Sequence, residues 1–278
     1  MLRLLKYLNR LRLGHKPIFV EYEYDMSPRW LGQGNLFLRD IIEKQAATIE
    51  TNLHSLKQFT PLVRMLKENG DLTPKVNWHN HFIPALDALS LFWAVSRSKS
   101  TFVEVGSGNS TIFARRAIEY FGLKTKLISI DPYPRVEINA LCDEIIRQPL
   151  EQVDLSLFEQ LQPGDVVFID NSHRSFMNSD VTVVMLDILP RLKKGVIIGF
   201  HDIFLPFDYF SSWSTRAYNE QYLLACFLLA NPHYFDLQLC NYWITSQNKH
   251  IDPLAEIWSL LGEDVKNRSA SAFWGIKS

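Results

Sequence analysis

Short apolar runs alternate with helical patterns along the middle of this chain, and this alternation limits the folds open to it. The runs predicted to be buried strands are residues 102–105, 127–130, 166–169 and 196–200. Helical spacing of apolar residues lies between them, at 112–121, 136–146 and 181–192. Strands that alternate with helices are typical of βαβ units. The sequence therefore predicts an α/β fold with a mostly parallel sheet.

Helical patterns also flank this region, at residues 36–70, 84–96 and 220–229, and two late strands are expected at 234–239 and 272–276. With 278 residues, the chain is long for one domain and short for two. We therefore expect an N-terminal helical extension over residues 1–80, placed to act as a lid, and a main domain over residues 81–278.

The first strand ends in a Gly-Ser-Gly turn at residues 106–108, followed by the N-cap types Asn109, Ser110 and Thr111. Glycine lets the backbone bend tightly and approach a ligand, and the free N–H groups of the following helix point into the space above the turn. Glu104 precedes the turn, and its carboxylate repels phosphate but attracts an ammonium group. Thr111 also occupies the third glycine position of the dinucleotide fingerprint, which argues against NAD.

Four predicted strands end in or beside a carboxylate: Glu104, Asp131, Asp170 and Asp202. Ligands of open α/β sheets bind outside the carboxyl ends of the strands, so these acids are expected to line one site. Asp131 is placed to accept hydrogen bonds from the vicinal hydroxyls of a ribose. A purely structural role for Asp131, opening the turn Asp-Pro-Tyr-Pro, is the less favoured alternative.

Two stretches, Val-Glu-Val-Gly-Ser-Gly-Asn-Ser and Ile-Ser-Ile-Asp-Pro, resemble the first two cofactor motifs of class I S-adenosylmethionine-dependent methyltransferases. The resemblance extends from about residue 82 to the C-terminus. It implies a Rossmann-like fold with a mostly parallel seven-stranded sheet and an antiparallel C-terminal hairpin. It also implies that the adenine of S-adenosylmethionine contacts the loop 147–152. The residues implied to bind the rest of the cofactor are Glu104, Gly106, Ser107, Gly108, Asn109, Ser110, Asp131 and Pro132.

The segment Asp170-Asn171-Ser172-His173 is predicted to carry the chemistry. An imidazole with an unperturbed pKa near ~6.5 suits a general base that deprotonates an acceptor hydroxyl. The segment resembles that of metal-assisted, catechol-type and sugar O-methyltransferases. By that resemblance His173 is the catalytic base beside Asp170, while Asp170, His201 and Asp202 hold Mg²⁺ or Mn²⁺. His201 departs from the oxygen ligand of the family, which favours Mn²⁺ over Mg²⁺ or leaves His201 outside the metal site. A metal-free mechanism with His173 or His201 as base stays open.

Aromatic residues are dense between 203 and 218, directly after the expected catalytic rim. A loop there would form one wall of a pocket for a small-molecule or sugar acceptor. Residues 27–30 and 78–81 are similarly rich in aromatic and polar groups, and each is a candidate to fold over the cofactor. The sequence does not identify the acceptor.

Two other functions compete with the methyltransferase. The first is a metal-dependent hydrolase or oxygenase that uses Asp170, His173, His201 and Asp202 as ligands, which leaves the turn at Glu104 without a role. The second is a non-catalytic, cofactor-binding scaffold protein. Binding of S-adenosylmethionine separates the methyltransferase from the hydrolase or oxygenase.

Net charge, cysteine content and the N-terminal residues indicate which partners and which cell compartment to expect. A net charge of −1 gives no support for nucleic-acid binding, and three scattered cysteines without a C-x-x-C pair indicate a reducing compartment. Residues 1–16 are basic with leucines near helical spacing, so membrane or partner contact through them is one expectation and a self-capping helix is another. No signal peptide or transmembrane run is evident, so we expect a cytoplasmic protein, with a homo-oligomer left open.

Overall fold

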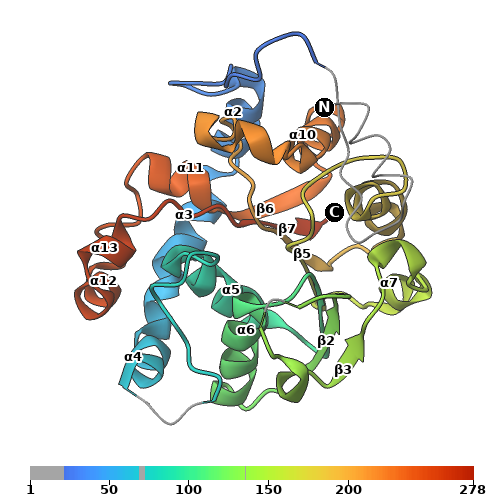
Figure 1. Ribbon diagram of the computed structural model, residues 1–278. Coiled ribbons are helices and arrows are strands. Elements are labelled where there is room, and N and C mark those ends of the chain that lie inside the picture. Colours follow the sequence, from blue (N-terminus) through green and yellow to red (C-terminus); the bar gives the residue numbers. More distant parts are fainter. Residues whose placement is uncertain (1–21, 69–72, 135) are drawn as a thin grey trace, which may run out of the picture.

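The computed structural model describes residues 22–68, 73–134 and 136–278 (Figure 1). The expected basic helix at residues 1–16 lies outside these ranges. Among the described residues, no helix is long and apolar enough to cross a membrane.

Seven strands within the described ranges form one sheet in the order β3-β2-β1-β4-β5-β7-β6 (Figure 1). The strands from β1 to β5 run parallel, whereas β7 is antiparallel to both β5 and β6. Their bounds are β1 Thr101–Val105, β2 Lys126–Ile130, β3 Glu144–Ile146, β4 Val166–Ile169, β5 Ile197–Phe200, β6 Phe235–Cys240 and β7 Phe273–Lys277. The expected parallel sheet with an antiparallel C-terminal hairpin is confirmed.

Helices flank this sheet and extend beyond it at both ends of the chain. Those that precede β1 are α2 Leu36–Glu43, α3 Ala46–Ser55, η1 Leu56–Phe59, α4 Thr60–Glu68 and α5 Ala85–Arg97. Those between strands are α6 Asn109–Tyr120, η2 Asn139–Leu141, η3 Leu150–Gln152, α7 Ser156–Gln160, α8 Asp180–Val183, η4 Val184–Ile188, α9 Leu189–Arg191, η5 Ser211–Arg216 and α10 Glu220–Ala230. The C-terminal set, between β6 and β7, is α11 Asn241–Ser246, α12 Ala255–Leu261 and α13 Glu263–Lys266.

One expected helix is wrong. Residues 136–146 instead form a loop, the short η2 turn and the edge strand β3, which pairs with β2. Their apolar residues divide between two sites, because Ile138 and Leu141 pack against Ile112 of α6 while Ile145 and Ile146 pair with β2. Of the expected helix over 36–70, the described residues 36–68 form separate segments, and the helix over 181–192 is present as the consecutive segments α8, η4 and α9.

The centre of the sheet is packed around Trp274 of β7. Its ring stacks on Phe168 of β4 with centroids 5.3 Å apart. A Cβ at Gly199 of β5 would lie 2.4 Å from the Trp274 ring, so this glycine makes room for the stack. Burial of such rings is a main source of stability in cores of this kind.

The N-terminal helices join the same apolar core. Asn52 of α3 donates to the Gln238 carbonyl of β6 at 3.2 Å and accepts from the Trp93 indole of α5 at 3.1 Å. Buried apolar residues between Leu38 of α2 and Trp274 of β7 form one connected core cluster. The division between residues 1–80 and 81–278 stays a prediction.

The strand order places the site. β1 has β2 on one side and β4 on the other, so chain connections leave it in both directions. Ligands of open α/β sheets bind at such a point, outside the carboxyl ends of the strands. The ends of β2, β1, β4 and β5 are therefore neighbours, and the acids predicted from the sequence lie along this edge.

Candidate active site

The glycine turn after β1 crosses directly over the end of β4. Gly106 has φ +80°, and a Cβ there would stand 1.9 Å from the carbonyl oxygen of Asp170. Its N–H donates to the Ile130 carbonyl at the end of β2, at 2.9 Å. Only glycine fits a left-handed position with so close a backbone contact.

Glu104 lies behind the turn and is fully buried. Thr111 ties it to the turn, because its hydroxyl donates to Glu104 and accepts from the N–H of Gly108 at 3.0 Å. The other Glu104 oxygen, Oε1, has no hydrogen-bond partner among the described residues. Burial raises the pKa of Glu104 to about 8. A buried carboxylate with a free oxygen beside the turn fits a ligand that brings positive charge.

Asp131 holds the other side of the turn. Its Oδ2 accepts from the Ser107 N–H at 2.8 Å and from the Ser107 hydroxyl at 3.0 Å. Its Oδ1 accepts from the N–H of Tyr133 at 2.8 Å. Asp131 therefore shapes the cradle in addition to any contact with a ribose, which stays a prediction.

A cleft of about 300 Å³ opens above the turn. It is lined by Val105, Gly106, Ser107, Ile130, Asp131, Pro132, Tyr133, Pro149, Leu150, Glu151, Asp170, Asn171, Ser172 and Asp180. Four residues predicted to bind the cofactor are in this lining, together with part of the loop expected to meet adenine. Glu104, Gly108, Asn109 and Ser110 are not, and Glu104 and Ser110 lie buried beneath the turn.

The structure brings His173 together with both predicted carboxylates. Its Nε2 lies 3.3 Å from Asp170 Oδ1 and 3.6 Å from Asp202 Oδ2. Its Nδ1 lies 2.9 Å from Glu220 Oε2, at the start of α10. The ring is 3% exposed, so these carboxylates meet it in a largely dry environment. His173 (φ +58°) and Asp202 (φ +54°) both occupy the left-handed region, which is uncommon for residues other than glycine.

His201 completes the cluster from the end of β5. Its Nδ1 lies 3.5 Å from Asp170 Oδ1 and 3.5 Å from Asp202 Oδ1, while Nε2 contacts Asp87 Oδ2 at 3.2 Å. Asp87, on α5, is itself fixed by the N–H groups of Ser271 and Ala272. Each histidine thus has one ring nitrogen held by an outer carboxylate and the other directed at the same two aspartates.

Charge pairing in this cluster shifts its pKa values. Burial works against the charged rings, yet the neighbouring carboxylates outweigh it and raise the pKa values of His173 and His201 well above the ordinary value. Burial also works against ionised Asp170, but the charge of His201 and the hydrogen bonds from both histidines hold its pKa below the ordinary value. The surroundings of His173 therefore favour the imidazolium, whereas a general base needs the neutral ring.

The predicted metal ligands Asp170, His201 and Asp202 do lie together. Even so, among residues 22–68, 73–134 and 136–278 no group of three or more His, Cys, Asp or Glu side chains is already spaced to hold a metal ion. The contacts are those of histidine–carboxylate ion pairs.

A second cavity, of about 860 Å³, adjoins this cluster. Its lining includes much of the predicted aromatic wall, namely Tyr209, Phe210, Trp213 and Tyr218, together with Ser27, Pro28, Arg174 and Arg216. The Tyr218 ring lies 4.7 Å from the ring of His173, so one wall of the cavity contacts the cluster. Phe204 and Phe207 are absent from the lining, and Phe204 packs against Tyr242.

The two N-terminal segments expected to cover the cofactor differ. Ser27 and Pro28 line the large cavity, whereas Trp78 is buried against Phe92 and Phe113. Trp78 is therefore a core residue and does not cover the cofactor cleft.

The sequence analysis missed Glu220 and Asp87, the outer partners of the two histidines. Asp87 left one signal, as the single acid in the otherwise apolar first half of α5. Glu220 opens α10, where an acid is common for the helix dipole alone.

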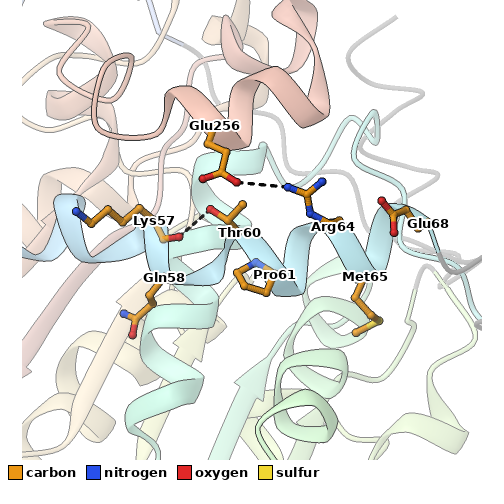
Figure 2. Close-up of a pocket in the computed structure, with 8 residues that line it drawn as sticks. All are labelled: Lys57, Gln58, Thr60, Pro61, Arg64, Met65, Glu68 and Glu256. Atoms are coloured by element: carbon orange, nitrogen blue, oxygen red, sulfur yellow. Dashed lines mark hydrogen bonds and ion pairs between the residues drawn. The ribbon is translucent and has the colours of Figure 1, made fainter.

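A shallow groove on α4 lies outside the strand-end site. Figure 2 shows its lining from η1 and α4, with Glu256 of α12 in an ion pair with Arg64 at 3.3 Å. The hydroxyl of Thr60 donates to the Lys57 carbonyl at 2.7 Å. None of its residues contacts the histidine–carboxylate cluster.

Comparison with known proteins gives one family match, over the central strands. Residues 103–203 match the family model described as a methyltransferase domain, a segment that runs from β1 to just beyond β5. It includes the glycine turn, Asp131 and the histidine–carboxylate residues Asp170, His173, His201 and Asp202. The match covers less than half of the chain and shows that residues 103–203 are similar to a methyltransferase domain. The hydrolase or oxygenase and scaffold alternatives gain no support.

Solved structures show looser likenesses. The cofactor-bound Rv0187 from MTB is 14% identical, with a TM-score of 0.38, over 64% of this chain and 79% of that chain. The O-methyltransferase TomG from Streptomyces achromogenes is 14% identical, with a TM-score of 0.35, over 78% and 88%. A SAM-dependent methyltransferase from Thiobacillus denitrificans is 15% identical, with a TM-score of 0.36, over 77% and 96%. No curated protein sequence matches the chain.

Proposed function

We propose that this enzyme transfers the methyl group of S-adenosylmethionine to a hydroxyl oxygen of a small molecule or sugar. One observation carries the proposal: the histidine–carboxylate cluster lies between the cleft that Asp170 lines and Tyr218 in the wall of the aromatic cavity. Asp170 lines the cofactor cleft, and His173, 3.3 Å from it, meets Tyr218 of the aromatic cavity. A hydroxyl held between the cavities would face both the donor and a proton acceptor.

Residues at the glycine turn are suited to bind S-adenosylmethionine. Glu104 lies directly behind the turn, where its negative charge would suit the ammonium of the methionine part, and the turn at Gly106 lets the ligand approach the backbone. Asp131 has two oxygens at the cleft and retains lone pairs for ribose hydroxyls beyond the bonds from Ser107 and Tyr133.

In this proposal His173 accepts the acceptor's proton. Glu220 holds Nδ1 and leaves Nε2 to face the rim, which is how a carboxylate orients a catalytic imidazole. His173 must first lose the proton that its neighbours favour. The acceptor oxygen then forms a bond to the methyl carbon as the carbon–sulfur bond breaks, and the products are the methyl ether and S-adenosylhomocysteine.

A divalent cation is a separable part of the proposal. The residues that would hold it are Asp170, His201 and Asp202, because Nδ1 of His201 lies 3.5 Å from both Asp170 Oδ1 and Asp202 Oδ1. An imidazole nitrogen with two carboxylates suits Mn²⁺ better than Mg²⁺. His173 stays outside this set, because its Nε2 must accept a proton. When bound, such an ion would lower the pKa of a coordinated hydroxyl.

The test is transfer of an isotopically labelled methyl group from S-adenosylmethionine to hydroxylated sugars and phenols, followed by mass spectrometry. We expect label on oxygen and formation of S-adenosylhomocysteine. Repeating the assay with EDTA, then with added Mn²⁺ or Mg²⁺, tests the cation alone. Label found only on nitrogen would overturn hydroxyl transfer. Failure to bind S-adenosylmethionine in calorimetry would overturn the proposed cofactor site.

A further inference from the structure

Two arginines line the aromatic cavity, and neither forms an ion pair with an acid among the described residues. The guanidinium of Arg216 lies 3.6 Å from the centre of the Trp213 ring, and that of Arg174 lies 5.1 Å from the centre of Tyr218. Arg216 is also 5.6 Å from the Tyr218 ring. Both guanidinium groups therefore contact the Tyr218 ring.

Fixed contacts hold Arg174 in this place. Its Nε donates to the Arg216 carbonyl at 2.7 Å and Nη1 donates to the Ser172 carbonyl at 3.2 Å. Among the described residues, neither Arg174 nor Arg216 has a carboxylate within ion-pair distance. Arg115 and Arg191, elsewhere on the molecule, each pair with an acid.

Asp208, which lines the same cavity, is bonded to other groups. Asp208 accepts from the N–H groups of Arg29 and Trp30 and from the hydroxyl of Tyr222. Asp25 also lines the cavity but forms no ion pair with either arginine. The positive charge at Tyr218 thus stays available to a ligand.

We infer that the methyl acceptor carries an anionic group, a carboxylate or a phosphate, which Arg174 and Arg216 bind. This inference rests on the proposed function, because it takes the aromatic cavity as the acceptor site. Planar guanidinium groups bind such oxyanions through paired hydrogen bonds. The aromatic rings of Trp213 and Tyr218 supply a surface for a sugar or phenol beside that group.

The charges also orient the acceptor. His173 lies against one side of Tyr218 and is surrounded by carboxylates, whereas the arginines contact the same ring with positive charge. An anionic group is repelled by Asp170 and Asp202 and attracted to the arginines. The hydroxyl of the same molecule is then directed toward the histidine–carboxylate end.

The experiment is calorimetry on the full chain with S-adenosylhomocysteine present. The probes are 4-hydroxybenzoate against 4-hydroxybenzamide, and glucuronate and glucose 6-phosphate against glucose. We expect at least one anionic probe to bind about tenfold more tightly than its neutral partner, since charge-assisted hydrogen bonds are worth that much. The glucuronate and glucose 6-phosphate arms distinguish carboxylate from phosphate.

The preference should disappear in Arg216→Gln and in Arg174→Gln. It should survive in Arg64→Gln, which removes an arginine from the groove of Figure 2 that does not touch the cavity. Equal binding of anionic and neutral probes, binding of no probe, or a preference that survives both cavity variants would overturn the inference. Binding does not require methyl transfer. A preference without labelled product would therefore contradict hydroxyl transfer and leave the anion site standing.

Discussion

The carbonyl oxygen of Asp170 lies 1.9 Å from the point where a Cβ on Gly106 would stand. This contact joins the cofactor turn of β1 to the residue that begins the histidine–carboxylate cluster after β4. A change at the turn would therefore displace the cluster as well, because neither backbone can yield without the other.

Gly106→Ala is expected to abolish binding of S-adenosylmethionine and to lower Tm. The alanine Cβ would clash with the Asp170 backbone. The positive φ would also destabilise the folded state by about 1 kcal/mol. The matched control is Gly122→Ala, because Gly122 has φ +61° but nothing within 4 Å of an added Cβ. The control should lower Tm by only about 2 °C. Equal Tm losses in the two variants, measured by calorimetry, would contradict the role of the contact.

The strand-end acids were open to prediction because the geometry of a parallel sheet brings strand ends together whatever the helices do. Asp170 and Asp202 therefore followed from sequence alone. Glu220 and Asp87 did not, since they come from helices far away in the sequence whose packing no local pattern encodes. The same reason explains why a helix was wrongly predicted where β3 lies. Ile145 and Ile146 belong to a strand that pairs with β2, but their spacing resembles that of a helix.

The aromatic wall was predicted in part. Aromatic density identified the segment that lines the cavity, but it gave no means to separate Trp213, which lines it, from Phe204, which packs beneath. The raised pKa of His173 was likewise hidden, because it depends on three carboxylates that meet only in the fold.

Glu104→Gln is expected to stabilise the ligand-free protein increasingly as pH rises from 5 to 8. The pKa of Glu104 is raised to about 8 by burial, so folding favours its neutral form. The stability from that group is complete below its unfolded pKa of about 4.5 and is lost as pH rises toward 8. Glutamine does not titrate and escapes the loss. Thermal unfolding at several pH values measures this as a growing Tm difference, and a constant difference would contradict it.

The same variant should bind S-adenosylmethionine more weakly than wild type, despite its higher stability at pH 8. The ammonium would lose the negative charge behind the turn, whereas Thr111 would keep a side chain to bond. Wild-type affinity should rise between pH 6 and 8 as Glu104 ionises, and that of Glu104→Gln should change less. Calorimetry at matched pH values measures both. Unchanged affinity in the variant would place the ammonium elsewhere.

Asp131→Ala is expected to weaken S-adenosylmethionine binding by about 10- to 100-fold. The change removes the bonds to Ser107 and Tyr133 that shape the turn, together with the proposed bonds to the ribose. The control Ser107→Ala deletes only the hydroxyl bond at 3.0 Å and keeps the N–H bond, so a small effect is expected. If the two variants bind alike, Asp131 acts on the turn alone.

His173→Asn is expected to reduce methyl transfer by at least about 100-fold while S-adenosylmethionine still binds. Asparagine is chosen because it tolerates the left-handed backbone at φ +58° and removes the imidazole without a clash. Glu220→Gln should retain the ring but weaken its orientation through Nδ1, with a smaller loss in kcat and little change in KM. Both are measured with the acceptor that gives the highest turnover.

The control for this last comparison is His250→Asn. His250 is also buried, but its Nε2 contacts the Lys266 carbonyl and its ring packs on Trp258, away from the strand-end edge. It should affect Tm and leave kcat near the wild-type value. If His173→Asn retains full turnover, the proton must leave by another group. His201 is then the first residue to test, because its Nδ1 faces the same two aspartates.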